Sequence, residues 1–237
     1  MELRPRSLST RRKSSKSYTL PVQLHLTSLI CLALLVMLQI PVDSACVQSI
    51  VKPSDPVSNR ITPSDYRPIT KAQRTNWFIE SVVGPESLAA GLASAGWGTA
   101  LDRPREYGPH ISGFAQRYVM RLPEVAMGNA IEAGLGAVWQ EDPRYNRSGQ
   151  GKLWHRVRHA ATMTVLACGS DGQAAPAYAR YAGIVGENFI ANGWRVDSER
   201  SVNTALTQSA LGFAGRFAGN LFGEFWTDVR QKVRHRK

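Results

Sequence analysis

One stretch of the chain, residues 141–159, holds the side chains best suited to proton transfer. The candidates are one acid, one tyrosine and two histidines: Asp142, Tyr145, His155 and His159. A carboxylate, a phenol and an imidazole within hydrogen-bond distance of one another could act as general acid and base, so one hypothesis is a hydrolase with its site here. The alternative is structural, because an Asp-Pro pair stops a helix and a tyrosine can anchor the following loop in the core. We favour the structural alternative.

The two histidines lie four residues apart on one predicted helix, a spacing that a metal site could use. The residue after His155 is Arg156 rather than the glutamate of a zinc-protease helix, and no third ligand stands out. The sequence also contains no Gly-x-Ser-x-Gly, no Walker loop and no dinucleotide-binding glycine pattern. We therefore expect no metal and no cofactor, and we lean towards a protein that is not an enzyme.

A second set of residues in the same region is basic and predicts a helical face that binds anions. Its members are Arg144, Arg147, Lys152, Arg156 and Arg158. The whole chain has a formal net charge of +11, and the basic excess persists beyond the cation-rich start of the chain. A basic surface attracts anionic lipid headgroups, anionic glycans or nucleic acid. Because the chain carries an export signal, we expect lipid or glycan and no nucleic acid.

Residues 1–45 have the three parts of a secretory signal: a cation-rich start, an apolar run over 26–40 and small residues before Cys46. The run is shorter than the roughly 20 residues that span a bilayer. We expect cleavage after Ala45, export, and a periplasmic or membrane-associated place in the cell envelope. Two alternatives stay open: a retained signal anchor, and lipidation of Cys46, which the preceding Asp43 disfavours.

The mature chain keeps two cysteines, Cys46 and Cys168. An oxidising compartment would allow one disulfide between them. Two unpaired thiols fit the sequence equally well, so both states stay open.

Beyond the leader, the sequence predicts a Pro-rich linker over 46–69 and one helical domain over 70–237 with a basic tail. Helical periodicity and stop signals predict an all-α fold, a compact bundle of about five to six helices rich in glycine and alanine. The helices are expected over 71–83, 85–100, 112–140, 152–167, from Pro176 to a left-handed Gly193, and from a cap at Asp197 or Ser198 to 233. We expect a break or kink at Pro123. No segment alternates with period two, so no sheet is predicted.

Glycines recur on one face of the last predicted helix. Their positions are Gly212, Gly215, Gly219 and Gly223. Each glycine costs a helix about 1 kcal/mol relative to alanine, so we expect close approach between helices to offset the loss. The same spacing packs membrane helices, and it therefore predicts a possible homo-oligomer. A further hypothesis is an integral or oligomeric assembly built on these faces.

A polar row, also on the last helix, is spaced by four: Arg216, Asn220, Glu224 and Asp228. We favour a solvated stripe with mild charge pairing. The alternative is a buried polar network that includes residues of two other helices: Asn129, Glu132, Glu187 and Asn188.

Several short patterns recur together over roughly residues 72–233. They are GNAIEAG at 128–134, EDPRY at 141–145 followed by RSG at 147–149, YAG at 181–183, and GN at 219–220 leading into EFW at 224–226. With this combination the chain resembles a group of exported bacterial helical proteins that have no assigned function. The resemblance implies a bacterial envelope setting and no particular reaction. The leading hypothesis is a non-enzymatic envelope protein that associates with anionic lipid or glycan through its basic helical face.

Overall fold

The computed structural model describes Cys46 and residues 66–148 and 151–234. The predicted signal segment and most of the linker lie outside these residues. Within them the fold is all-α, a compact helical bundle, which confirms the predicted fold class. The helices are α2 (Lys71–Val83), α3 (Pro85–Ala100), α4 (Ile111–Trp139), α5 (Leu153–Val165), α6 (Tyr178–Ala191) and α7 (Val202–Arg234). One small hairpin, β1 (Leu166–Cys168) and β2 (Ala174–Pro176), joins α5 to α6.

The helix ends follow local sequence signals. Thr70 and Gln73 form a reciprocal capping box at the start of α2. Gly84 ends α2, and Pro85 provides the first residue of α3. Gln140 closes α4 in the left-handed conformation, with φ 60°. These signals place the first three helices within a residue or two of their predicted bounds.

Three local predictions were wrong. We predicted no sheet, but the chain forms a hairpin whose three-residue strands are too short to show an alternating pattern. Strand β1 also ends α5 at Val165, before the predicted end at 167. Gly193 does not have positive φ, because Asn192 ends α6 in a right-handed conformation. Helix α7 begins after Ser201, whose hydroxyl accepts from the Thr204 amide, whereas 197–199 form a short 3-10 turn. Helix α4 continues through Pro123 as one element.

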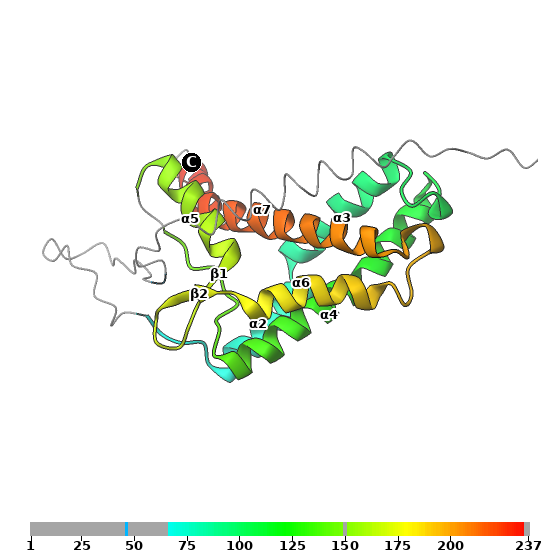
Figure 1. Cartoon of the computed structure of the whole chain (residues 1–237). Coiled ribbons are helices and arrows are strands. Elements are labelled where there is room, and N and C mark those ends of the chain that lie inside the picture. The colour runs from blue at the N-terminus through cyan, green and yellow to red at the C-terminus, as the bar shows by residue number, and fades with distance from the viewer. Residues whose placement is uncertain (1–45, 47–65, 149–150, 235–237) are drawn as a thin grey trace, which may run out of the picture.

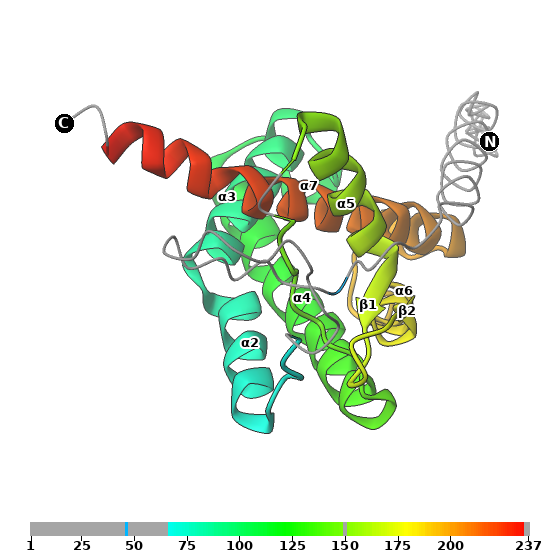
Figure 2. The same cartoon turned by 90° about the vertical axis from the view of Figure 1, so that its left-hand side faces the viewer.

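The bundle is built around the pair α4 and α6. Helices α2 and α3 pack on α4, and α7 packs on α5 and α6 (Figures 1 and 2). Helix α3 and helix α7 thus pack on different helices of the bundle. The buried disulfide between Cys46 and Cys168 packs with Met163 at the end where the hairpin lies.

Close backbone approach occurs at the pair α4 and α6. A Cβ added to Gly183 would lie 2.7 Å from the Gly128 carbonyl oxygen, and one added to Gly128 would collide with the Glu187 carboxylate. The prediction of tight packing is wrong for the middle of the α7 stripe. At Gly215 and Gly219 an added Cβ would meet no described atom within 4 Å, because α7 does not pack against another helix along that face.

Candidate functional site

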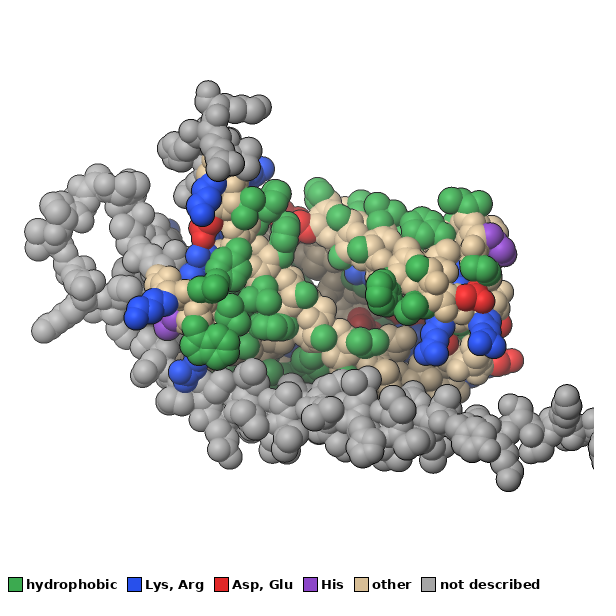
Figure 3. Space-filling view, turned by 90° about the horizontal axis from the view of Figure 1, so that it is seen from above, with side chains coloured by type: hydrophobic (Ala, Val, Ile, Leu, Met, Phe, Trp, Pro, Cys, Tyr) green, Lys and Arg blue, Asp and Glu red, His purple; other side chains and the backbone are tan. Residues whose placement is uncertain are grey.

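The interior of the molecule is unusually polar. Fully buried side chains include Glu224, Asn146 and Asp142, whereas large apolar side chains such as Ile111 and Trp97 are exposed. Figure 3 shows hydrophobic side chains spread over the outer surface of the helices. Buried carboxylates and arginines must satisfy one another, because an unpaired buried charge is strongly destabilising. The interior therefore contains ion clusters beside a small apolar core.

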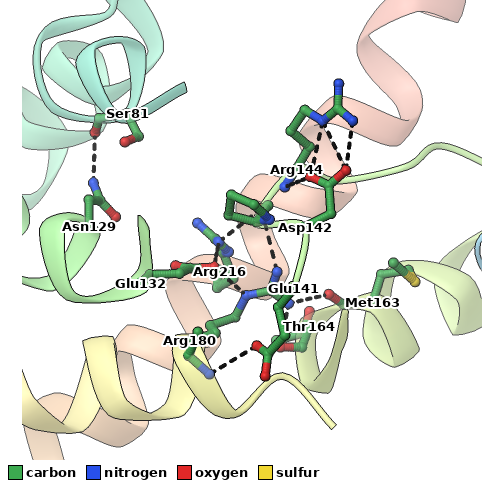
Figure 4. Close-up of polar contacts among 12 residues, drawn as sticks. Ser81, Asn129, Glu132, Glu141, Asp142, Arg144, Met163, Thr164, Arg180 and Arg216 are labelled. Atoms are coloured by element: carbon green, nitrogen blue, oxygen red, sulfur yellow. Dashed lines mark hydrogen bonds and ion pairs between the residues drawn. The ribbon is translucent and has the colours of Figure 1, made fainter. Parts of the chain in front are cut away.

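The first cluster is centred on Glu132 of α4 (Figure 4). Its Oε1 accepts from Arg180 Nε at 3.0 Å and from Arg216 Nη2 at 2.5 Å. Arg180 also donates to the carbonyl oxygens of Met163 and Leu166, at 2.7 and 3.1 Å. One arginine thus ties α6 to α4 and to the junction of α5 with β1.

The second cluster is centred on Glu224 of α7, which is fully buried. Its carboxylate accepts from Arg156 Nε at 2.8 Å and from the Tyr145 hydroxyl at 2.7 Å. Burial first, and then the hydrogen bond to Glu224, raise the pKa of Tyr145 far above its ordinary value. Arg156 also pairs with Asp228 at 2.5 Å. The tyrosine therefore stays a neutral donor that helps to hold the buried carboxylate.

Asn220 and Glu224 of the α7 polar row are buried, and Arg216 and Asp228 are partly buried in ion pairs, so the row is not the solvated stripe that we favoured. Arg216 binds Glu132, and Asn220 donates to Thr164 Oγ1 at 3.0 Å. The predicted single network is, however, divided. Asn129 donates to the Ser81 carbonyl oxygen, and Asn188 accepts from Arg195, so neither joins the Glu132 cluster directly.

The four candidates for catalysis do not converge. Asp142 accepts from Arg144 Nη2 at 2.6 Å and from the Tyr66 hydroxyl at 2.9 Å. The rings of Tyr145 and His159 are in contact, with centroids 5.9 Å apart, but the hydroxyl of Tyr145 is directed to Glu224. His159 Nε2 lies 2.7 Å from the Asn146 carbonyl oxygen, and His155 is exposed.

The predicted basic face is likewise divided. Arg144 and Arg156 bind buried carboxylates, and Arg147 donates to the Glu224 carbonyl oxygen. Only Lys152 and Arg158 of the set are classed as exposed. This division could not be predicted from the sequence, because an arginine that binds a carboxylate of a distant helix has the same spacing as an arginine in solvent.

Cys46 and Cys168 are joined by a disulfide, and both are buried. Asn146 Nδ2 donates to Cys168 Sγ at 3.1 Å. A sulfur in a disulfide has no valence left for a thioether, so this form of the protein is not lipidated at Cys46. No cluster of three His, Cys, Asp or Glu side chains suited to a metal ion occurs in the described part of the chain.

A large cavity lies between α3 and α7, and the sequence did not predict it. Its volume is about 1800 Å³, and residues of α3, α4, α6 and α7 line it. Figure 3 shows a hollow near the centre of the molecule with charged side chains inside it. Arg216 lies deep in the molecule, yet 24% of its side chain is accessible because it borders this cavity.

Two further charged residues border the cavity with few partners. Arg121 makes one long hydrogen bond, at 3.4 Å to the Ser87 carbonyl oxygen, and burial lowers its pKa. Glu187 forms no ion pair or hydrogen bond with another residue of the described part of the chain. Burial, and secondarily the Glu124 carboxylate, raise the pKa of Glu187 to about 8. The cavity is therefore the candidate functional site.

No family model, curated protein or solved structure matches the chain. Among the described helices, none combines the length and apolar character needed to cross a membrane.

Proposed function

We propose that the chain is a non-enzymatic protein of the cell envelope that associates peripherally with membranes containing anionic lipid. The observation that carries the proposal is the start of α5. There Leu153 and Trp154 are 70% and 75% exposed, and they are flanked by the exposed Lys152, His155 and Arg158. Tryptophan and leucine beside cations are typical of segments that lie in the membrane interface.

This arrangement favours lipid over glycan as the anionic partner. An exposed leucine next to an exposed tryptophan gains free energy by entering the acyl boundary, whereas a glycan offers no such apolar phase. Lys152 and Arg158 would each add about 1 kcal/mol of attraction to an anionic surface. Arg144 and Arg156 are not part of this surface, because buried carboxylates bind them.

The disulfide supports the envelope setting. Disulfides persist in oxidising compartments outside the cytoplasm and are rare inside it. The bond between Cys46 and Cys168 is buried, so it is part of the core of the folded domain. Mass spectrometry of the mature N-terminus would identify cleavage after Ala45, acylation or a retained leader.

The proposal is tested by sedimentation with vesicles of phosphatidylcholine, with and without phosphatidylglycerol. We expect binding to the anionic vesicles alone, weakened by added salt, because screening reduces attraction between exposed charges. Trp154→Ala and the double variant Lys152→Gln/Arg158→Gln should each lower the affinity roughly fivefold or more. Salt-insensitive binding, or no binding at low salt, would contradict the proposal.

Matched controls use exposed residues elsewhere on the molecule. Trp139→Ala removes a tryptophan from the end of α4, and Lys71→Gln removes a cation from the start of α2. Both should bind vesicles like the unmodified chain. Equal losses in the controls would show that binding is not localised to α5.

A further inference from the structure

The cavity between α3 and α7 is larger than a small-molecule site. Pockets for small ligands have volumes of roughly 300–1,000 Å³, whereas this one measures about 1800 Å³. Helix α3 packs on α2 and α4, and α7 packs on α5 and α6, so the two helices face each other across open space. An occupant of this space would have to be long or bulky.

Part of the cavity wall, between charged residues such as Arg180 and Arg216, is made of small and apolar residues. From α3 these are Ala90, Ala95, Trp97 and Gly98, and from α7 they are Leu211, Gly212, Gly215, Gly219 and Gly223. At Gly215 and Gly219 no packing contact offsets the loss of helix propensity, about 1 kcal/mol for each glycine. An apolar chain lying along this wall would supply the missing dispersion contacts.

The charged lining of the cavity carries an arginine that is not committed to a carboxylate. Arg121 forms no ion pair within 4.0 Å among the described residues, and its one hydrogen bond is long. By contrast, Arg195 binds Glu124 at 2.8 Å, and Arg216 binds Glu132 at 2.5 Å. Arg121 is thus available to a ligand.

Two other polar groups of the cavity lining favour an anion over a cation. Burial raises the pKa of Glu187, which borders the same cavity, to about 8, so its carboxyl group carries little negative charge at pH 7. The indole nitrogen of Trp194 is buried without a hydrogen-bond partner in the described structure, and Trp194 also lines the cavity. The lining therefore offers a guanidinium and further donors.

We propose that this cavity binds a long-chain amphiphile with one anionic head, a carboxylate or a phosphate. The head lies at Arg121, and the chain lies along the bare face of α7 around Gly215 and Gly219. This site is separate from the start of α5 and does not depend on membrane association. Free fatty acids and single-chain phosphate lipids share the required chemistry.

The test is calorimetric titration of the delipidated full chain with dodecanoate, dodecyl phosphate, 1-dodecanol and inorganic phosphate. We expect dodecanoate, dodecyl phosphate or both to bind. The alcohol and inorganic phosphate should bind at least roughly tenfold more weakly than the tighter of the two anionic amphiphiles. Dodecanoate and dodecyl phosphate distinguish the two sources of the anionic head. Equal binding of the alcohol would overturn the role of Arg121, and equal binding of inorganic phosphate would overturn that of the chain.

Two variants separate loss of the site from loss of the fold. Gly219→Leu places a side chain in open space on the cavity wall, so it should leave the fold intact and weaken amphiphile binding roughly tenfold or more. Gly96→Leu is the matched control, because a Cβ there also meets no described atom within 4 Å but the residue does not line the cavity. Arg121→Gln should weaken the anionic amphiphiles and leave the alcohol unchanged.

Unchanged binding by a folded Gly219→Leu variant would overturn the proposal. So would a chain that is a stable dimer without amphiphile and becomes a monomer on Gly219→Leu, because α7 would then be covered by a second copy. Loss of vesicle binding in the α5 variants should leave these titrations unaltered, so failure of either proposal can be recognised independently.

Discussion

At the scale of single residues, Glu187 has the most informative environment. It lies on α6 opposite Gly128 of α4, where a β-carbon would collide with its carboxylate. Burial is the main cause of its raised pKa, and Glu124 adds to the effect, whereas Arg195 and Arg121 oppose it. The glycine makes room for a carboxyl group that folding holds in its neutral form.

This predicts a specific dependence of stability on pH. The pKa of Glu187 rises from 4.5 to about 8 on folding, so between these values the native state binds more protons than the unfolded state. The stability that protonated Glu187 contributes is fully present below pH 4.5 and is lost as pH rises through about 8. The free energy of unfolding falls by up to about 1 kcal/mol for each pH unit in this interval. Glu187→Gln should flatten this part of the profile.

The measurement is urea unfolding of both proteins from pH 5 to pH 9. The stability of the unmodified chain relative to the variant should fall across the interval and level off above about pH 8. Parallel profiles would show that Glu187 ionises normally in the folded protein.

At the scale of elements, the glycines fall into two groups that the sequence does not distinguish. Gly183 lies where α6 meets the backbone of α4, whereas Gly215 faces the cavity. Both lie inside predicted helices rich in glycine and alanine. Whether a neighbouring helix covers such a face depends on pairs of helices far apart in the chain, which a local pattern does not contain.

Alanine substitutions at these two glycines should have opposite effects. Gly183→Ala brings a methyl group to 2.7 Å from the Gly128 carbonyl oxygen, so we expect a loss of about 1–3 kcal/mol in unfolding free energy. Gly215→Ala meets open space and should gain up to about 1 kcal/mol from helix propensity. Chemical denaturation of the pair measures both, and changes of the same sign would contradict the assignment.

At the scale of the whole molecule, the bounds of α2, α3 and α4 could be predicted closely from the sequence, and the ion clusters could not. Caps, prolines and glycines placed α2 and α3 correctly, because these signals act within a few residues. The pairing of Glu224 with Arg156 joins positions 68 residues apart. The charges near Arg156 favoured an exposed face, and nothing local marked it as the partner of a buried carboxylate.

The disulfide is the longest covalent constraint on the described fold, because its cysteines are 122 positions apart in the sequence. A crosslink across so long a segment restricts the unfolded chain strongly, so its reduction should lower the unfolding free energy by about 2–5 kcal/mol. Urea unfolding with and without reductant measures the change. The variant Cys46→Ser/Cys168→Ser serves as control and should not respond to reductant. A urea midpoint that does not change on adding reductant, together with free thiols at Cys46 and Cys168 before reduction, would contradict the disulfide.

The bond at Cys46 also sets where the domain meets whatever precedes it in the chain. Residue 46 is fixed covalently to β1, so the preceding segment departs from the hairpin and not from the start of α2. A leader retained in a bilayer would therefore hold the hairpin close to the lipid and determine which end of the bundle points towards it.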